Sequence, residues 1–293
     1  MEIGFGCAFL HKSKKPERLI EYALNKGIKY FDVAPTYGRF YGENEKYLGS
    51  VLNNIGKDLE HIIIATKILA RRKQDVLWEL EGIKNRLPKI DILQLHSVDT
   101  LNCLNLITSD DGALSILQRL KDQGIISKIG ITNHYDPEVL KIALEKFEFD
   151  TFMLPLGPLN FFRDRELESR GKISFRQLAK IIQNQKKKVI GILILGAGLI
   201  TDKKLVRKSL LFVFNQPVDV VLIGFTKENE IDFALEVFQE FKKGTNLSKS
   251  EFLTILKEIA NLVRKDKPWW WQAPVDLGPF ENSQEFRRSL KLL

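Results

Sequence analysis

Four side chains with complementary acid–base chemistry stand at the ends of apolar segments in the first third of the chain. Asp32 closes the segment IKYFD, and Tyr37 follows five residues later; Lys67 closes IIIATK and His96 closes ILQLH. Each alone has an ordinary explanation, as a turn residue, a packed ring, a surface lysine or a hydrogen-bonded core histidine. Their occurrence at successive segment ends favours a catalytic interpretation.

The chemistry that this set supports is protonation of a carbonyl oxygen. A phenol has a pKa near 10 and is a poor acid at neutral pH, but an ammonium within about 4 to 6 Å favours its ionised form. We expect Lys67 to supply that charge to Tyr37, and Asp32 to hold Lys67 by an ion pair. A ring N–H of His96 would orient the carbonyl. Tyr37 transfers only a proton, so the hydride must come from a nicotinamide.

These residues are set in a regular alternation of apolar runs and amphipathic stretches. Short apolar runs predict strands over residues 3–8, 28–33, 61–66, 91–96, 127–132, 150–155, 189–195 and 218–224. Apolar residues at helical spacing predict helices over residues 16–26, 43–54, 74–87, 112–124, 137–147, 174–185, 203–215 and 227–241. Strict alternation of this kind indicates parallel strands joined by helical crossovers, and near-continuous apolar strands indicate burial on both faces.

The predicted fold class is α/β, a (β/α)8 TIM barrel with an extra C-terminal helix and tail. Eight units favour the closed barrel, and the lack of a G-x-G-x-x-G after the first strand disfavours an open dinucleotide-binding sheet. We predict a single domain over residues 1–293, with the barrel at about 1–240 and the helix and Trp-rich tail at about 247–293. In such a barrel, chemistry lies at the carboxyl ends of the strands, where the four side chains stand.

Composition excludes several other classes. The chain of 293 residues has no apolar run long enough to span a membrane and begins unlike a secretory signal, so we expect a cytoplasmic protein. Its two cysteines form neither a disulfide framework nor a metal-ligand spacing. The net charge of +8 is spread over short runs at 71–73, 186–188 and 203–204, which we interpret as solvated helix ends rather than a nucleic-acid surface. The surplus would suit an anionic ligand.

The sequence resembles the aldo-keto reductase family. FDVAPTYG with GENEKYLG, IIIATK, IDILQLHSVD and ISKIGITN are similar to that family's four signature segments. The resemblance implies a (β/α)8 barrel that uses NADP(H), with NAD(H) as the alternative, to interconvert a carbonyl and an alcohol. It implies Tyr37 as the general acid/base, Lys67 and Asp32 as the residues that tune it, and His96 as the residue that orients the substrate.

The same resemblance places the cofactor, with three departures from the family pattern. Thr132 and Asn133 would contact the nicotinamide amide, but Met153 replaces a glutamine that usually assists them. Leu195 ends a strand without the aromatic or basic residue often found near it, and Thr226 follows Gly224 where an arginine is common. Lys227 and the following helix start would hold a 2′-phosphate, because helix N-termini favour anions. The implied cofactor-binding residues are Thr132, Asn133, Met153, Leu195, Gly224 and Lys227.

Aromatic residues in the loop after Tyr37 and in the tail are candidates for the substrate pocket: Phe40, Trp269 and Trp270. The competing interpretation is that the tryptophans pack the tail onto the barrel or form a subunit contact, because large aromatics dominate packing and interfaces alike.

Two functions remain open at this stage. The first is an NADP(H)-dependent oxidoreductase of a small aldehyde, ketone or sugar, which the intact set of four residues favours. The second is a catalytically silent barrel acting as a binding or regulatory subunit, which the altered cofactor residues favour. No recognition motif supports nucleic-acid binding, and the oligomeric state does not follow from the sequence.

Overall fold

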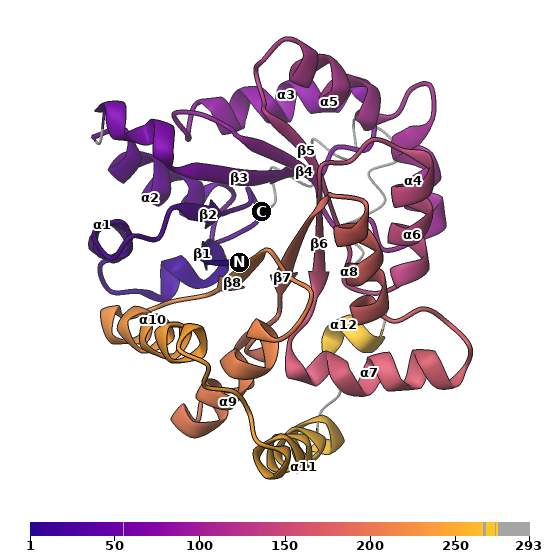
Figure 1. Ribbon diagram of the computed structural model, residues 1–293. Helices are drawn as coiled ribbons and strands as arrows, with labels where there is room; N and C mark the ends of the chain where they lie inside the picture. Colours follow the sequence, from indigo (N-terminus) through magenta and orange to yellow (C-terminus); the bar gives the residue numbers. More distant parts are fainter. Residues whose placement is uncertain (55, 266–267, 273, 275–293) are drawn as a thin grey trace.

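The apolar runs form the eight strands of a closed parallel barrel in the computed structural model, which describes residues 1–54, 56–265, 268–272 and 274. The strands are β1 Glu2–Gly6, β2 Tyr30–Asp32, β3 Ile63–Ile68, β4 Ile92–Leu95, β5 Lys128–Thr132, β6 Thr151–Pro155, β7 Lys188–Ile192 and β8 Val220–Ile223. Each strand pairs with its neighbours in chain order, and β8 closes the ring on β1. The predicted (β/α)8 barrel is confirmed (Figure 1).

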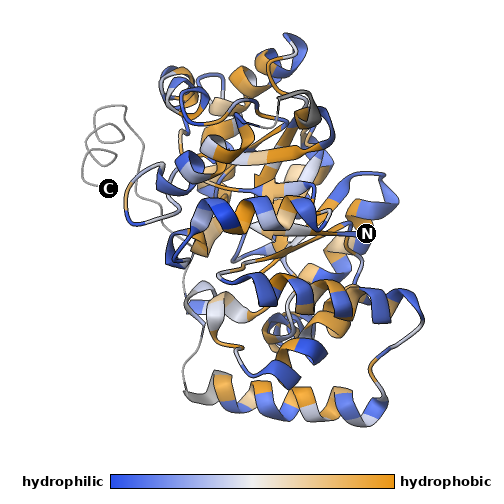
Figure 2. Cartoon of the chain, turned by 90° about the vertical axis from the view of Figure 1, so that its left-hand side faces the viewer, coloured by the Kyte–Doolittle hydropathy of each residue, from blue (hydrophilic) through white to orange (hydrophobic). Residues whose placement is uncertain are grey.

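Eight helices follow the strands as predicted and surround the barrel (Figure 1). They are α1 Pro16–Asn25, α2 Glu43–Leu52, α3 Lys73–Lys84, α5 Ala113–Asp122, α6 Pro137–Lys146, α8 Phe175–Asn184, α9 Lys203–Phe214 and α10 Glu228–Lys242. Strands and inward helix faces are apolar and outer helix faces are polar (Figure 2), which explains why apolar periodicity located them. Among the described residues, none of the helices combines the length and the apolar character that crossing a membrane requires.

Two helices in the barrel loops, the short tail helix α12 Trp269–Gln272 and three short 3-10 segments were not predicted. α4 Leu101–Thr108 and α7 Pro158–Ser169 follow β4 and β6 and lengthen the loops at the carboxyl ends of the strands. The 3-10 segments are Cys7–Lys12, Gly56–His61 and Gly196–Gly198. The sequence of α7, PLNFFRDRELES, lacks a regular apolar stripe, so periodicity gave no signal for it.

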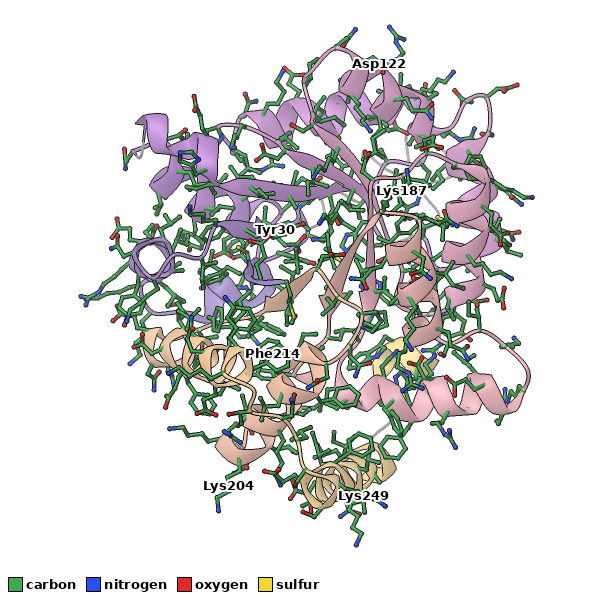
Figure 3. The ribbon with its side chains drawn as sticks, viewed as in Figure 1. Tyr30, Asp122, Lys187, Lys204, Phe214 and Lys249 are labelled. Atoms are coloured by element: carbon green, nitrogen blue, oxygen red, sulfur yellow. The ribbon has the colours of Figure 1, made fainter. Side chains whose placement is uncertain are left out.

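The interior of the barrel changes from apolar to polar toward the mouth. An apolar cluster inside the strands includes Tyr30, Ala65 and Ile92. Figure 3 labels Tyr30 among the side chains of the barrel. Because side chains alternate along a strand, the residues two positions further on also point inward. On β2 and β3 these are Asp32 and Lys67, and both are buried. Residues two positions apart on a strand face the same side, so a layer of inward-facing polar side chains lies directly above the apolar layer.

The C-terminal helix packs beside the barrel, over two of its outer helices. α11 Lys249–Lys265 contacts α7 and α9 (Figure 1), and its buried Ile255 and Ile259 join Leu159, Ile200 and Leu205 in one apolar cluster. The helix predicted after the barrel is thus present. α12 Trp269–Gln272 follows it, and the rest of the predicted tail, residues 275–293, lies outside the described residues.

A buried carboxylate on α3 holds the chain where it leaves β3. Glu79 accepts hydrogen bonds from the backbone N–H groups of Leu69 and Ala70, each at 2.9 Å, and from the hydroxyl of Tyr41 at 2.9 Å. Burial raises the pKa of Glu79 to about 7, although these three hydrogen bonds favour the ionised form. The turn directly after Lys67 is therefore fixed by a group that titrates near neutrality.

We expect Gly130→Ala to destabilise the barrel. A Cβ at Gly130 would lie 2.5 Å from Oγ1 of Thr151 and 2.7 Å from Cγ of Gln94, so both buried side chains must move. Overpacking of this kind costs about 1–3 kcal/mol in the free energy of unfolding. Urea denaturation measures it. Lys128→Ala, at the exposed end of the same strand, serves as the control and should change the value by less than about 0.5 kcal/mol. Equal free energies of unfolding for Gly130→Ala and Lys128→Ala would contradict the packing argument.

We expect Glu79 to make stability fall as the pH rises toward 7. Its pKa of about 7 in the folded chain exceeds the value of about 4.3 for an unfolded glutamate, so between these values the folded chain binds more protons. The free energy of unfolding then decreases with rising pH by about 1–3 kcal/mol and levels off above 7. Glu79→Gln keeps an acceptor for the backbone but removes the titration.

The measurement is urea denaturation of wild type and Glu79→Gln at several pH values between 4.5 and 8. Asp164, whose pKa burial also raises to about 7, adds a second contribution, so Asp164→Asn is the matched comparison. Parallel stability curves for wild type and Glu79→Gln would show that Glu79 does not titrate in this window.

Candidate active site

A buried ion pair lies at the base of the mouth. Nζ of Lys67 lies 2.5 Å from Oδ2 of Asp32 and donates a second hydrogen bond to the carbonyl of Val33 at 2.9 Å. The other carboxylate oxygen of Asp32 accepts from Nε2 of Gln94 at 2.9 Å. Only 1% of the Lys67 side chain and 4% of the Asp32 side chain are exposed. Both charges are thus removed from water and held by neighbouring strands.

Asp32 keeps Lys67 charged despite this burial. Desolvation alone would lower the pKa of Lys67, but its interactions with Asp32 and Tyr37 outweigh that effect and raise the pKa. The site therefore holds a positive charge at a fixed place, as the sequence predicted.

Tyr37 lies over this charge, in the loop between β2 and α2. Nζ of Lys67 is 4.7 Å from the centroid of the Tyr37 ring. The pKa of Tyr37 is nevertheless raised, because burial favours the neutral phenol more than the charge of Lys67 favours the phenolate. The sequence-based expectation of a lowered pKa is thus wrong in its net sign. The phenol is protonated at neutral pH, which is the form required of a proton donor.

His96 completes the group from the end of β4. Its ring centroid is 6.1 Å from that of Tyr37, with the planes at 83°. Burial lowers the pKa of His96 well below its usual value, and electrostatic interactions with Lys67, His134 and Arg71 lower it further. The imidazole is therefore neutral at physiological pH. Among the described residues its buried Nδ1 has no hydrogen-bond partner.

A cavity of about 920 Å³ opens over these side chains. Asp32, Tyr37 and His96 line one part of it. The remainder is lined mainly by apolar residues of the loop after β7 and by the segment from β8 into α10. The structure thus brings the predicted catalytic residues to a single cavity wall, with Lys67 buried directly behind them.

The predicted cofactor residues separate into two groups. Leu195 and Gly224 line the cavity, as does Thr226, but Lys227 is exposed and lies outside the lining. Thr132, Asn133 and Met153 are fully or almost fully buried and also lie outside the lining.

The buried group is already engaged in local structure. Oγ1 of Thr132 accepts from the N–H of Ser97 at 2.7 Å. Oδ1 of Asn133 accepts from the N–H groups of Tyr135 and Asp136, and its Nδ2 donates to the carbonyl of Val98 at 2.6 Å. Met153 packs in the apolar interior of the barrel. The side-chain amide of Asn133 thus stabilises the turn after β5 and links it to the loop after β4.

Two of the predicted substrate-pocket aromatics, Phe40 and Trp270, do not line the cavity. Phe40 is 69% exposed on the loop after Tyr37. Trp270 is buried, and its indole N–H donates to Oδ1 of Asn160 on α7 at 3.2 Å. Its carbonyl accepts from Nη1 of Arg163 at 2.5 Å. The structure therefore gives Trp270 the packing role, which corrects its assignment to the pocket. The side chain of Trp269 lies outside the described residues.

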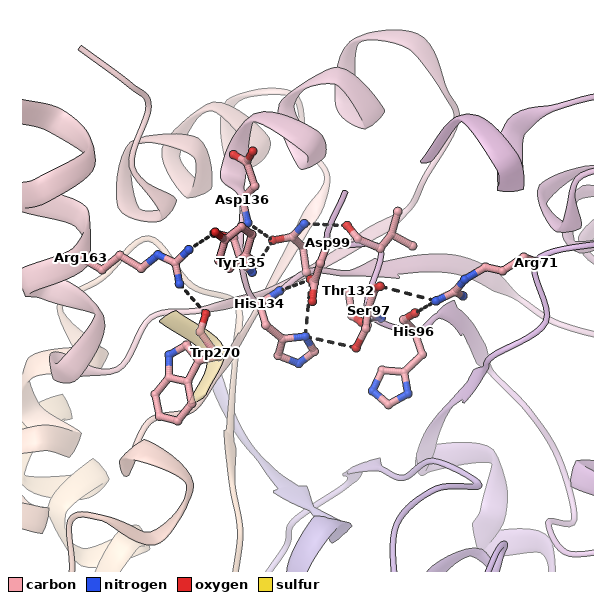
Figure 4. Close-up of polar contacts among 12 residues, drawn as sticks. Arg71, His96, Ser97, Asp99, Thr132, His134, Tyr135, Asp136, Arg163 and Trp270 are labelled. Atoms are coloured by element: carbon pink, nitrogen blue, oxygen red, sulfur yellow. Dashed lines mark hydrogen bonds and ion pairs between the residues drawn. The ribbon is translucent and has the colours of Figure 1, made fainter. Parts of the chain in front are cut away.

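Arg71 contradicts the expectation that residues 71–73 form a solvated helix end. It is 6% exposed, and its Nη2 donates to the carbonyl of His96 at 2.5 Å (Figure 4). Ser97, which directly follows His96, has a φ of 50°, a conformation that a non-glycine residue adopts at some cost in free energy. Arg71 thus fixes the backbone from which the His96 ring extends.

Gln94, Ser97 and His134 were also missed. Gln94 interrupts the apolar run ILQLH and could have been recognised as inward-facing because it lies two residues before His96. Ser97 and His134 both line the cavity, and Oγ of Ser97 lies 3.3 Å from Nδ1 of His134 (Figure 4). His134 is placed by its backbone N–H, which donates to Asp99 at 2.7 Å. Nothing in the sequence around His134 indicated this position.

Comparisons with known proteins agree with this geometry. The sequence matches the model of the Aldo/keto reductase family over residues 2–210, and no curated protein matched it. The fold is similar to the holo form of an aldo-keto reductase from Bacillus halodurans, with a TM-score of 0.66 and 21% identity over 89% of this chain and 91% of that chain. An aldo/keto reductase from Brucella melitensis gives a TM-score of 0.63 and 16% identity over 87% of this chain and 93% of that chain.

An aldose reductase from Giardia lamblia gives a TM-score of 0.61 and 16% identity over 88% of this chain and 92% of that chain. At such identities the solved structures establish the shared fold. The family match covers more than half of the sequence. The chain therefore belongs to the Aldo/keto reductase family, whose members are oxidoreductases of carbonyl substrates.

Proposed function

We propose that this chain interconverts a small aldehyde or ketone and the corresponding alcohol, with Tyr37 as the proton donor and a nicotinamide dinucleotide as the hydride source. The observation that carries the proposal is the placement of a protonated phenol, a buried ammonium and a neutral imidazole at one cavity wall. Each group is in the protonation state that carbonyl reduction needs.

The residues divide the proton chemistry among them. Tyr37 donates its proton to the carbonyl oxygen, and the phenolate that results is stabilised by Lys67, whose Nζ is 4.7 Å from the ring centroid. Asp32 keeps Lys67 in place and charged. Neutral His96 donates a ring N–H to the same carbonyl oxygen and holds it beside Tyr37. In the oxidative direction the phenolate accepts the proton from the alcohol.

The cavity fits a dinucleotide in size and in composition. Its volume of about 920 Å³ is at the upper end of the range for ligand sites, about 300–1,000 Å³. When bound, the nicotinamide supplies or accepts the hydride. Apolar residues Ile192 and Leu195 offer a surface for a flat ring, and Ser97 and His134 present polar atoms near His96. These residues are the candidates to hold the nicotinamide, in place of the buried Thr132, Asn133 and Met153.

The burial of Thr132, Asn133 and Met153 supports a second candidate function, a barrel that binds a ligand or partner without catalysis. Three of the residues that would hold the nicotinamide do not face the cavity. The two candidates differ in cofactor binding. A barrel without hydride transfer would give no saturable binding of NADH or NADPH at millimolar concentration, whereas the oxidoreductase binds at least one of them.

We expect Tyr37→Phe to lower kcat by about 10²- to 10⁴-fold, because phenylalanine keeps the aromatic ring but lacks the hydroxyl that donates the proton. Turnover is followed by the absorbance of the reduced nicotinamide with a panel of aldehydes and ketones. Cofactor affinity should change by less than about twofold, because the substitution removes a single hydroxyl that acts on the carbonyl.

Tyr22→Phe is the matched control, since its hydroxyl donates to Asp232 at the protein surface. This variant should retain wild-type turnover. If Tyr37→Phe keeps the wild-type kcat, Tyr37 is not the proton donor.

A further inference from the structure

The cavity extends from Tyr37 and His96 to the segment that leads from β8 into α10. On the proposed function, the nicotinamide must lie beside Tyr37 and His96, because hydride and proton are delivered to the same carbonyl. The other nucleoside must therefore occupy the part of the cavity that lies away from these residues. That part is lined by the segment from β8 into α10, including Thr226, Asn229 and Glu230.

The start of α10 is already capped by a carboxylate of the chain itself. Oε2 of Glu230 accepts from the backbone N–H of Thr226 at 2.7 Å and from that of Lys227 at 3.2 Å. Both of its oxygens lie 3.2 Å from Oγ1 of Thr226, which donates to them. Glu230 thus pairs the two backbone N–H groups that directly precede α10 and places a carboxylate in the cavity beside the helix start.

This arrangement has opposite consequences for the two forms of the cofactor. NADP(H) differs from NAD(H) by a phosphate on the 2′-oxygen of the adenosine ribose. At this helix start the phosphate would have to displace the carboxylate of Glu230 or lie against it, and the two negative charges repel. A ribose hydroxyl can instead donate to that carboxylate, which is how acidic residues recognise the 2′-OH in other dinucleotide sites.

The nearby cations do not reverse this preference. Lys227 is exposed and lies outside the cavity lining, so water screens its charge. Lys203 and Lys12 also line the cavity. Nζ of Lys203 lies 4.7 Å from the centroid of the Phe233 ring on α10, and Nζ of Lys12 lies 4.3 Å from the centroid of the Phe9 ring. Both ammonium groups can pair with the diphosphate that the two cofactors share, so neither charge by itself distinguishes the cofactors.

We propose that Glu230 is a specificity-determining residue that makes this chain select NAD(H) against NADP(H). The inference rests on the proposed function, and it reverses the expectation from sequence that Lys227 and the helix start hold a 2′-phosphate. In sequence Glu230 is one of two acidic residues in KENE. Only the hydrogen bonds that it accepts from Thr226 and Lys227 reveal that its carboxylate is held at the helix start.

The experiment measures binding rather than turnover. Isothermal titration calorimetry of the full chain with NADH and NADPH should give a dissociation constant at least roughly tenfold lower for NADH. ADP-ribose and its 2′-phosphorylated form, which lack the nicotinamide, should show the same order, because the selection lies at the adenosine end. These two ligands separate the role of Glu230 from that of the residues proposed to hold the nicotinamide.

Glu230→Gln removes the charge while its side-chain oxygen still accepts from the helix start, so the fold of α10 is retained. We expect the preference for NADH to shrink about tenfold, mainly through tighter binding of NADPH. Glu228→Gln is the matched control. Glu228 lies two residues earlier on the same helix, is ion-paired with Arg18 at 2.9 Å and lies outside the cavity lining, so its variant should keep the wild-type ratio.

The outcomes separate this inference from the proposed function. Equal or tighter binding of NADPH by the wild type overturns the inference and leaves the oxidoreductase intact. An unchanged ratio in Glu230→Gln shows that Glu230 does not determine it. If the wild type binds none of the four ligands, the cofactor half of the proposed function fails together with the inference.

Discussion

The ammonium of Lys67 is almost completely removed from water, and the rest of the site is arranged around that charge. An isolated charge in an apolar interior is costly, and breaking a buried pair by removing one partner typically costs about 3–5 kcal/mol. Asp32 offsets this cost from the next strand, and Gln94 holds the second oxygen of Asp32. A well-packed apolar pair would stabilise such a barrel equally well. The ion pair is thus better explained by what its charge does at the mouth than by stability.

Burial and charge act together to set the protonation states of the two groups above Lys67. For Tyr37 the two effects oppose each other, and burial prevails, so the phenol stays neutral. For His96 they act in the same direction, because burial and neighbouring cations both disfavour an imidazolium. The buried ammonium of Lys67 is therefore compatible with two neutral hydrogen-bond donors, the hydroxyl of Tyr37 and a ring N–H of His96. Once a proton has left Tyr37, the same ammonium stabilises the phenolate, so the charge contributes most when the reaction requires it.

The parts of this architecture that could be predicted are those that local patterns encode. Alternating apolar runs gave the eight strands, and period-two alternation implies that Asp32 and Lys67 point inward. The net pKa of Tyr37 was predicted with the wrong sign because spacing reveals neighbours but not the degree of burial. Arg71 was misjudged for a related reason: whether an arginine is solvated or buried against the carbonyl of His96 depends on a turn that the sequence does not specify.

Glu230 shows how a requirement of folding can determine ligand choice. Every helix start leaves backbone N–H groups without partners, and the chain can satisfy them with its own side chain or leave them for a ligand. At α10 the N–H of the N-cap residue Lys227 is satisfied internally, because the carboxylate of Glu230 reaches back to it and to the N–H of Thr226. A glutamine at the same place would satisfy the same donors without a charge. The capping hydrogen bonds therefore fix the position of the Glu230 side chain. Because Glu230 also lines the cavity, its negative charge acts on any ligand bound there.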